Sequence, residues 1–180
     1  MGCGYSEGRA RLKMKYKYDL SAEKEFKRVA VMPKPRGFIV FDSFNNEWFP
    51  LSTVTVDKTT FNLRLLKDEF HRTYGGSSYQ ELFMPFHYSV ELIGKNYYCT
   101  STRPINYKSL IPGYEEYISI CIVGDSNLDI YSPDFYKVIA HTVMNPLHYI
   151  QGWRLNPADK TTFHNLGSGF KEKQLEKNFR

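Results

Sequence analysis

The side chains that could perform acid–base or metal chemistry are scattered along this sequence. His71-Arg-Thr73 has the form of half of a paired His-x-Thr phosphoesterase signature, but the other candidate, His141-Thr-Val143, lacks the second hydroxyl. His141 and His148 are separated by Pro146, and no His-Glu-x-x-His zinc motif occurs. We therefore interpret these histidines as surface or helix-end residues.

Nucleophilic and acidic residues also lack the surroundings that would activate them. No Gly-x-Ser-x-Gly elbow precedes a helix, and Gly167-Ser-Gly169 is too poor in glycine and lysine to cradle a phosphate. Asp125 follows a glycine, which is more typical of a turn cap than of a catalytic base. We expect the three cysteines, an odd number at no metal-ligand spacing, to be reduced; they are Cys3, Cys99 and Cys121. Cys121 lies inside an apolar run, so we expect it to serve packing.

The run at residues 117–125 is the element that the rest of the chain must surround. It is rich in β-branched and apolar residues and stops at a Gly-Asp turn. Alternate side chains of an extended chain face opposite ways, and neither set here carries a charge. The two sets are Ile118, Ile120 and Ile122, and Ser119, Cys121 and Val123. This pattern predicts a central strand that is buried on both faces.

Strands and helices alternate on either side of this run. Residues 37–43, 86–93 and 97–101 have strand patterns, and Gly94-Lys-Asn96 predicts a hairpin turn between the last two. Residues 152–169 are mostly turn-like. Together with the helices described next, this order predicts an α/β fold, a mixed central β-sheet flanked by helices.

Two helices are predicted from their caps and apolar stripes. Thr59 or Thr60 can cap a helix that runs to about residue 73, with an inner stripe of Phe61, Leu65, Leu66 and Phe70. Ser132-Pro-Asp134 opens the second helix with a capping residue, a proline and an acid. Its inner stripe consists of Phe135, Val138, Ile139 and Thr142.

Length and charge favour one domain with basic ends. A chain of 180 residues that is 42% hydrophobic can bury one sizeable core. Residues 1–36 carry ten Lys and Arg against four Asp and Glu, and residues 171–180 carry four against two, so the body at 37–170 is net acidic. The body therefore gives no reason to expect a nucleic-acid groove. We find no membrane-spanning run and no signal-peptide core, so we expect a chain that is made in the cytoplasm.

The N-terminal arm, residues 1–36, supports several alternatives. Met1-Gly-Cys-Gly-Tyr-Ser6 fits the N-myristoylation pattern, with an ordinary terminus as the alternative. Basic and apolar side chains then alternate as in a half-buried strand, with a basic side formed by Arg9, Arg11, Lys13, Lys15 and Lys17. The segment is either an edge strand whose lysines discourage aggregation, or an arm that docks its apolar side on a partner and offers its basic side to acidic surfaces or nucleic acid.

Several landmarks follow one another across residues 37–170. They are Phe38-Ile-Val-Phe-Asp-Ser43, Pro85-Phe-His-Tyr-Ser-Val90, Ser119-Ile-Cys-Ile-Val-Gly-Asp125, and Ile150-Gln-Gly-Trp-Arg-Leu-Asn-Pro157 followed by Lys160-Thr161. Their order resembles that of the type-2 N-acetylmuramoyl-L-alanine amidases and peptidoglycan recognition proteins, which include amidase-type phage lysozymes. The resemblance implies an amidase-like domain at 37–170, between the arm and a basic C-terminal tail at 171–180.

In that family, two histidines and a cysteine or aspartate hold zinc, and a tyrosine and often a lysine stabilise the oxyanion. The resemblance places the three ligand positions on Phe41, Trp153 and Thr162, and the tyrosine and lysine positions on Phe86 and Lys160. Phenylalanine and tryptophan offer zinc no lone pair, and threonine is a poor ligand. Only Lys160 keeps the residue type of the family, so we expect no catalytic residue, no metal and no cofactor.

A shifted metal site is the alternative within the same resemblance. Asp42 is adjacent to Phe41 and His164 is two residues from Thr162, so Asp42, His164 and His87 could together hold a metal. Adjacent strand residues face opposite sides of a sheet, however, so Asp42 would have to turn the wrong way. We therefore expect a filled, apolar former site, either as part of the core or as a stacking surface.

The resemblance thus implies a catalytically inactive amidase-like module, with an active peptidoglycan amidase that has a displaced site as the alternative. Such a module either binds a cell-wall fragment or serves as a structural or docking part of an assembly such as a phage particle. The expected partners are proteins or further copies of the chain, and then a peptidoglycan fragment or, through the arm, nucleic acid. The residues that would line the old cleft are Phe86, His87, Trp153, Arg154 and Lys160.

Overall fold

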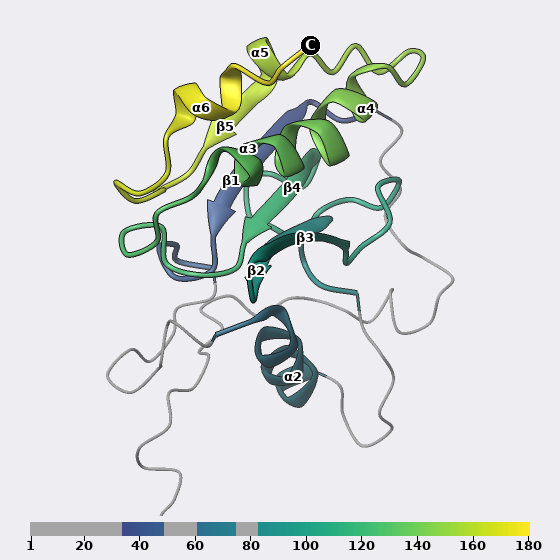
Figure 1. Ribbon diagram of the computed structural model, residues 1–180. Helices are drawn as coiled ribbons and strands as arrows, with labels where there is room; N and C mark the ends of the chain where they lie inside the picture. The colour runs from purple at the N-terminus through teal and green to yellow at the C-terminus, as the bar shows by residue number, and fades with distance from the viewer. Residues whose placement is uncertain (1–33, 49–60, 75–82) are drawn as a thin grey trace, which may run out of the picture.

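The computed structural model describes residues 34–48, 61–74 and 83–180. In these ranges five strands form one mixed sheet in the order β3-β2-β4-β1-β5 (Figure 1). The strands are β1 (Gly37–Asp42), β2 (Tyr88–Ile93), β3 (Asn96–Ser101), β4 (Tyr117–Ile122) and β5 (Thr161–Phe163). Helices lie on both faces of this sheet, so the predicted α/β class, a mixed sheet flanked by helices, is confirmed.

The central strand of the sheet is β4. It pairs in parallel with β1 on one side and with β2 on the other. Its side chains divide between two core clusters as the alternation predicts, with Ile118, Ile120 and Ile122 in one and Cys121 and Val123 in the other. Because β4 is covered on both faces it needs no polar side, which explains why its sequence is an almost unbroken apolar run.

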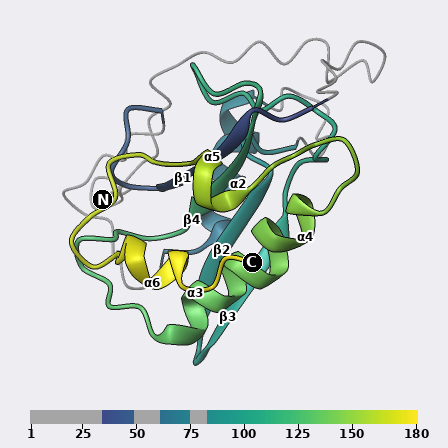
Figure 2. The same cartoon turned by 90° about the horizontal axis from the view of Figure 1, so that it is seen from above.

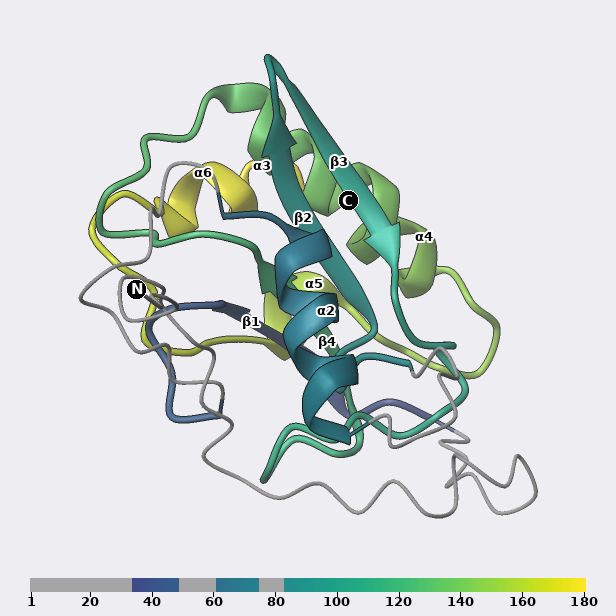
Figure 3. The same cartoon turned by 90° about the horizontal axis from the view of Figure 1, so that it is seen from below.

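The helices form one layer on each face of the sheet. Helix α2 (Leu63–Tyr74) lies on one face, which Figure 3 shows from below. The other face carries α3 (Pro133–Ile139), η1 (Ala140–Met144), α4 (Asn145–His148) and α6 (Glu172–Glu176), which Figure 2 shows from above. No helix within the described ranges is long and apolar enough to cross a membrane.

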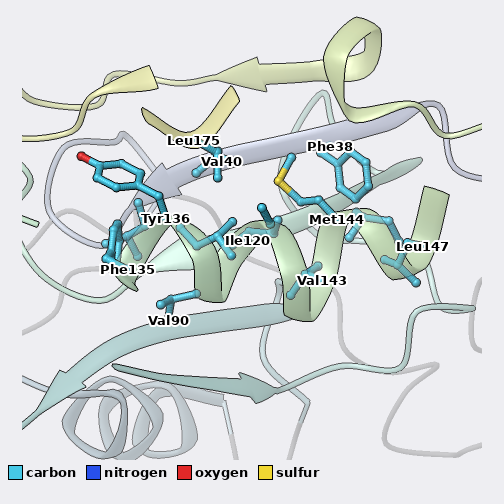
Figure 4. Close-up of a cluster of buried hydrophobic side chains, with 14 of the residues drawn as sticks. Phe38, Val40, Val90, Ile120, Phe135, Tyr136, Val143, Met144, Leu147 and Leu175 are labelled. Carbon is cyan, nitrogen blue, oxygen red and sulfur yellow. The ribbon is translucent and has the colours of Figure 1, made fainter. Parts of the chain in front are cut away.

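The larger core cluster fills the space between the sheet and the layer of α3, α4 and α6 (Figure 4). Strand side chains pack there against side chains of the helices, among them Phe38, Val40, Ile120, Phe135, Val143, Met144 and Leu147. Leu175 of α6 is fully buried in the same cluster. Residues 171–180 are therefore packed onto the domain, although the sequence suggests only a basic tail.

The helix that begins at Pro133 is not regular over its whole length. Helix α3 passes into the π-helical turn η1 and then into α4, which has Pro146 in its first turn. Proline has no N–H to donate and its ring crowds the carbonyl four residues earlier, so a regular ladder cannot run through this point. The π turn contains one extra residue, so it changes which of the following side chains face the core. Thr142, predicted for the inner stripe, is exposed, and Val143 and Met144 are buried instead.

The starts of the two main helices also differ from the prediction. Asn62 caps α2, since its Oδ1 accepts the N–H of Leu65 at 3.0 Å. Leu65 itself is 45% exposed, and the buried stripe of α2 consists of Leu63, Leu66 and Phe70. Ser132 is the N-cap of α3, but its hydroxyl makes no cap hydrogen bond. The rigid φ of Pro133 supports the start of α3 without that bond.

The stretch predicted as turns, residues 152–169, contains two short elements. They are α5 (Pro157–Lys160), which Asn156 caps by accepting the N–H of Ala158 at 3.1 Å, and β5. Strand β5 adds to the edge of β1 in parallel register, with Ile39 opposite Thr162. Three residues with two threonines carry too weak a strand pattern to be recognised alone, and the pairing with β1 is what stabilises them.

Several predicted features lie outside the described residues. One is the N-terminal arm up to residue 33, which includes Cys3 and the basic side formed by Arg9, Arg11, Lys13, Lys15 and Lys17. The others are the cap positions Thr59 and Thr60 and the side chains of His71 and Thr73.

Candidate functional site

Phe41, the position of the first ligand in the resemblance, lies within a group of aromatic rings on the α2 face of the sheet. Its ring contacts those of Trp48 and Phe86 edge to face, with centroid separations of 5.1 and 6.0 Å. These three side chains are at most 2% exposed. Edge-to-face pairs at this spacing are favourable, so the position that the resemblance assigns to the first ligand is part of a packed core.

Two further rings continue this packing toward the surface. His164 stacks on Trp48 with a centroid separation of 4.3 Å, and its Nε2 lies 3.2 Å from Oε2 of Glu47. Tyr114 meets both Trp48 and His164 edge to face. We refer to this group as the aromatic cluster, which consists of Phe41, Trp48, Phe86, Tyr114 and His164.

The other two ligand positions do not both reach the aromatic cluster. Thr162 is paired with Ile39, which belongs to the same core cluster as Phe41, so Thr162 shares that face of the sheet. Trp153 packs against the core cluster on the opposite face. The expectation that three positions surround one former site therefore fails at Trp153, because the sheet lies between it and Phe41.

The residues proposed to line an old cleft are not presented together. Phe86 and His87 are fully buried, so neither contacts solvent. Arg154, which adopts a φ of 51°, and Lys160 at the end of α5 are exposed. Phe86 and His87 therefore cannot serve as cleft walls. Arg154 and Lys160 remain available at the surface.

His87 is held in one tautomer by two hydrogen bonds. The backbone N–H of Ser119 donates to Nδ1 at 3.0 Å, which requires Nδ1 to be unprotonated. The proton is then on Nε2, which donates to the carbonyl of Tyr107 at 2.7 Å. Burial lowers the pKa of His87 to about 4. The hydrogen bond to the Tyr107 carbonyl opposes this shift in part, and the nearby charge of Arg103 adds to it. His87 is thus a neutral structural residue that fastens β4 to the segment before β2.

Asp42 ends β1 and is fully buried. Its Oδ1 accepts the N–H groups of Phe44 at 3.0 Å and of Asn45. Its Oδ2 accepts Nδ2 of Asn45 at 2.6 Å and the N–H of Ser126 at 3.0 Å, and it also accepts the hydroxyl of Ser126. A buried carboxylate is stable when its lone pairs are satisfied in this way. Asp42 therefore ties the loop after β1 to the loop after β4.

The same joint includes a third loop. Ser126 Oγ accepts the N–H of Gly167, and the N–H of Ser168 donates to Oδ1 of Asn127 at 3.3 Å. Asp125 accepts the N–H of Asn127 at 2.9 Å, which confirms its predicted role as a turn cap. We refer to this set as the Asp42 network, whose members are Asp42, Asn45, Asp125, Ser126, Asn127, Gly167 and Ser168.

A displaced metal site has no basis in the described part of the chain. There, no group of three or more His, Cys, Asp and Glu side chains is placed to hold a metal ion. Asp42 is committed to its network, both ring nitrogens of His87 are hydrogen-bonded, and His164 is stacked on Trp48 beside Glu47. The candidate ligands therefore serve three separate structural purposes.

The two cysteines within the described ranges are free and unreactive. Burial raises the pKa of Cys99 to about 11, and burial together with the charge of Asp42 raises that of Cys121 well above the ordinary value. The nucleophilic thiolate is therefore scarce at neutral pH. His141 is exposed, and His148 Nδ1 lies 2.8 Å from the carbonyl oxygen of Arg180, which agrees with the expected surface and helix-end roles.

Three polar residues that no sequence pattern links line the same cavity. Glu91, Asp129 and Tyr131 line a cavity of about 270 Å³ where β2 and β4 end. Glu91 falls in a strand and the other two in a loop, at spacings that match no motif, so only the fold brings them together.

Comparison with known proteins gives no independent identification. The chain matches no protein-family model, and no curated protein shows significant sequence similarity to it. Function must therefore be inferred from the geometry just described.

Proposed function

We propose that this chain is a catalytically inactive, amidase-like module that acts through protein contacts, as a structural or docking part of an assembly such as a phage particle. The amidase relationship is supported by the order of the predicted landmarks, three of which overlap β1, β2 and β4, while the last runs from the loop after α4 through α5 to the first residue of β5. Trp153 departs from this relationship, as described above.

The observation that carries the proposal is the packing of Phe41. A catalytic zinc needs donor atoms about 2.0–2.3 Å away and an open position for water. At Phe41 the space is taken by its own ring and by those of Trp48 and Phe86. A ring at this one ligand position, packed against two neighbouring rings, leaves no room for a metal and adds to the core, so the scaffold keeps its fold without the chemistry.

Protein contact is favoured over cell-wall binding by what is exposed. The residues proposed for a muropeptide cleft are either buried or spread over different parts of the surface. Large apolar side chains, in contrast, are exposed at the β2–β3 hairpin and in the loop before α3, namely Leu92, Ile93, Tyr98, Leu128 and Ile130. Exposed apolar groups of this size are typical of surfaces that meet another protein.

To test the proposal, the full chain is incubated with purified peptidoglycan, and released muropeptides are measured by chromatography. Bound zinc is measured by mass spectrometry. An active amidase is the positive control. We expect no release and less than stoichiometric zinc. Stoichiometric zinc together with released muropeptides would establish the displaced-site amidase and overturn the proposal.

A pull-down on peptidoglycan sacculi separates binding from scaffolding. A module that works through protein contacts shows no saturable retention. Saturable retention that is lost on Arg154→Ala and Lys160→Ala, and kept in the exposed control Lys137→Ala, would instead assign cell-wall binding to the inactive module.

A further inference from the structure

The cavity of about 270 Å³ lies at the ends of β2 and β4, away from the aromatic cluster. Its walls come from β2, β3, β4, the start of α3 and the loop before it. The volume approaches that of pockets that hold small organic groups. The residues that carry the argument are Phe61, Glu91, Tyr97, Asp129, Tyr131 and Phe135.

Aromatic rings form the apolar part of this cavity. Tyr131 stacks on Phe135 with a centroid separation of 4.0 Å, and Tyr97 meets Phe135 edge to face at 5.1 Å. Phe135 is 1% exposed and belongs to the larger core cluster, so these rings are supported from behind by the core. Rigid ring faces of this kind attract cations and pack well against aliphatic chains.

The charged groups of the cavity are both acidic. Glu91 is 8% exposed, and its Oε2 accepts the N–H of Leu63 at 2.7 Å, while its Oε1 accepts no hydrogen bond from the residues that the structure describes. Asp129 lies against Gly124, where a β-carbon would come within 2.8 Å of its Oδ2 and where the φ is +139°. Among the described residues, no lysine, arginine or histidine lines the cavity. Two carboxylates without a basic side chain beside them in that part of the chain therefore line one partly open cavity.

Tyr131 adds an unsatisfied hydrogen-bonding group. Its hydroxyl oxygen is buried and has no hydrogen-bond partner of good geometry, although it lies close enough to Asp129 to stabilise that carboxylate. Burial and the charge of Asp129 raise the pKa of this hydroxyl far above its ordinary value, so it stays protonated and its oxygen remains an acceptor. Burial, followed by the charge of Asp125, raises the pKa of Asp129, and the Tyr131 hydroxyl opposes this rise. Burial is the larger cause of both shifts, and the neighbouring carboxylates add to it a negative potential that a bound cation would relieve.

We infer that this cavity binds an alkylammonium group, either the side chain of a lysine that a protein partner presents or a small free amine. The ammonium donates to Asp129, to Oε1 of Glu91 and to the hydroxyl oxygen of Tyr131, and the aliphatic stem packs on the rings. Leu92 and Ile130, which line the cavity and are 55% and 93% exposed, offer apolar contacts to whatever carries the amine. The inference stands apart from the amidase relationship, because it uses none of those positions.

The experiment measures binding by isothermal titration calorimetry to the full chain. The probes are N-acetyl-lysine methylamide, its uncharged isostere N-acetyl-norleucine methylamide, pentane-1,5-diamine, and a short apolar peptide with one central lysine. We expect lysine to bind with a dissociation constant on the order of millimolar and norleucine to bind at least about tenfold more weakly. Stronger binding of the peptide assigns a protein partner, and stronger binding of the diamine assigns a small amine.

Variants locate the binding in this cavity. Asp129→Asn should weaken lysine binding by about tenfold, and Tyr131→Phe by severalfold, since each removes one acceptor. Asp134→Asn, at an exposed carboxylate in the first turn of α3 that does not line the cavity, is the matched charge control and should change affinity by less than about twofold. Thermal unfolding of each variant checks that it is folded.

Two results would overturn the inference. One is equal binding of the lysine and norleucine probes, and the other is an absence of saturable binding by all charged probes to a folded wild-type chain. Peptidoglycan hydrolysis is scored in a separate assay, so the failure of either proposal can be recognised without the other.

Discussion

Acidification from about pH 7 to about pH 4 should destabilise the fold through His87. The imidazole is buried, and it accepts the backbone N–H of Ser119 at Nδ1. Protonation would place two donors face to face at this point and would put a charge in the core near Arg103, whose charge already contributes to the low pKa. The unfolded chain, in contrast, takes up the proton freely.

The size of the effect follows from the two pKa values of His87. In the unfolded chain the pKa is near 6.5, and in the folded chain it is about 4. Between these values the unfolded state binds more protons, so stability is complete above about pH 6.5 and is lost as the pH falls toward 4. At about 1.4 kcal/mol for each tenfold change in proton affinity, His87 contributes a loss of about 3 kcal/mol.

Urea unfolding at a series of pH values separates this loss from that of the carboxylates. The variant His87→Gln has no titrating group at this position. It should be less stable than the wild type by about 1–3 kcal/mol at neutral pH, because Ser119 loses its acceptor. Between about pH 7 and about pH 4, the free energy of unfolding of the variant should fall by about 3 kcal/mol less than that of the wild type.

Parallel stability profiles for the two proteins would refute this reasoning. An NMR titration of the imidazole in the wild type provides an independent check that does not require the variant to fold. A pKa near the ordinary value, instead of one near 4, would show that His87 is not held as the structure describes.

Three further predictions concern single side chains. Phe41→Ala should lower the free energy of unfolding by about 3–5 kcal/mol in a denaturant titration, because it opens a cavity in the aromatic cluster. The control Leu65→Ala, at an exposed site of α2, should change it by less than about 1 kcal/mol. Asp42→Ala should cost about 3 kcal/mol or more, since it leaves buried donors of two loops unpaired, and hydrogen exchange should show Asn45 and Ser126 losing protection together. Tyr131→Phe should change the melting temperature little, because the buried hydroxyl makes no well-formed hydrogen bond and interacts only with Asp129. A clear decrease would show that the contact with Asp129 stabilises the fold.

The elements that were predictable from the sequence are those whose signal is local. The alternating apolar run of β4 identified the central strand, because burial on both faces requires such a run wherever the strand lies. The hairpin turn at Gly94, which has a φ of +64°, and the proline start of α3 are likewise set by the conformations that these residues adopt.

The features that were missed depend on partners distant in the sequence. β5 is recognisable only from its pairing with β1. Thr142 faces solvent and not the core because the helix contains a π turn just before Pro146, and apolar periodicity does not reveal such a turn. Trp153 matched a sequence landmark, but the face of the sheet on which it packs is a property of the fold. The cavity of Glu91, Asp129 and Tyr131 is likewise assembled from separate segments, so its polar groups have no common spacing.

The Asp42 network has a practical consequence for labelling this molecule. Two loops at one end of the sheet share a single buried carboxylate, and a third is bonded to them through Ser126 Oγ, so an inserted tag in any of them would disturb the other two. Lys95, in the hairpin between β2 and β3, is exposed, whereas its neighbour Gly94 adopts a φ of +64° that a side chain would strain. The hairpin also carries the exposed apolar side chains proposed to meet a partner. A small fluorophore on Lys95 should therefore report on an assembly without loosening the joint, while a grafted epitope would block the contact.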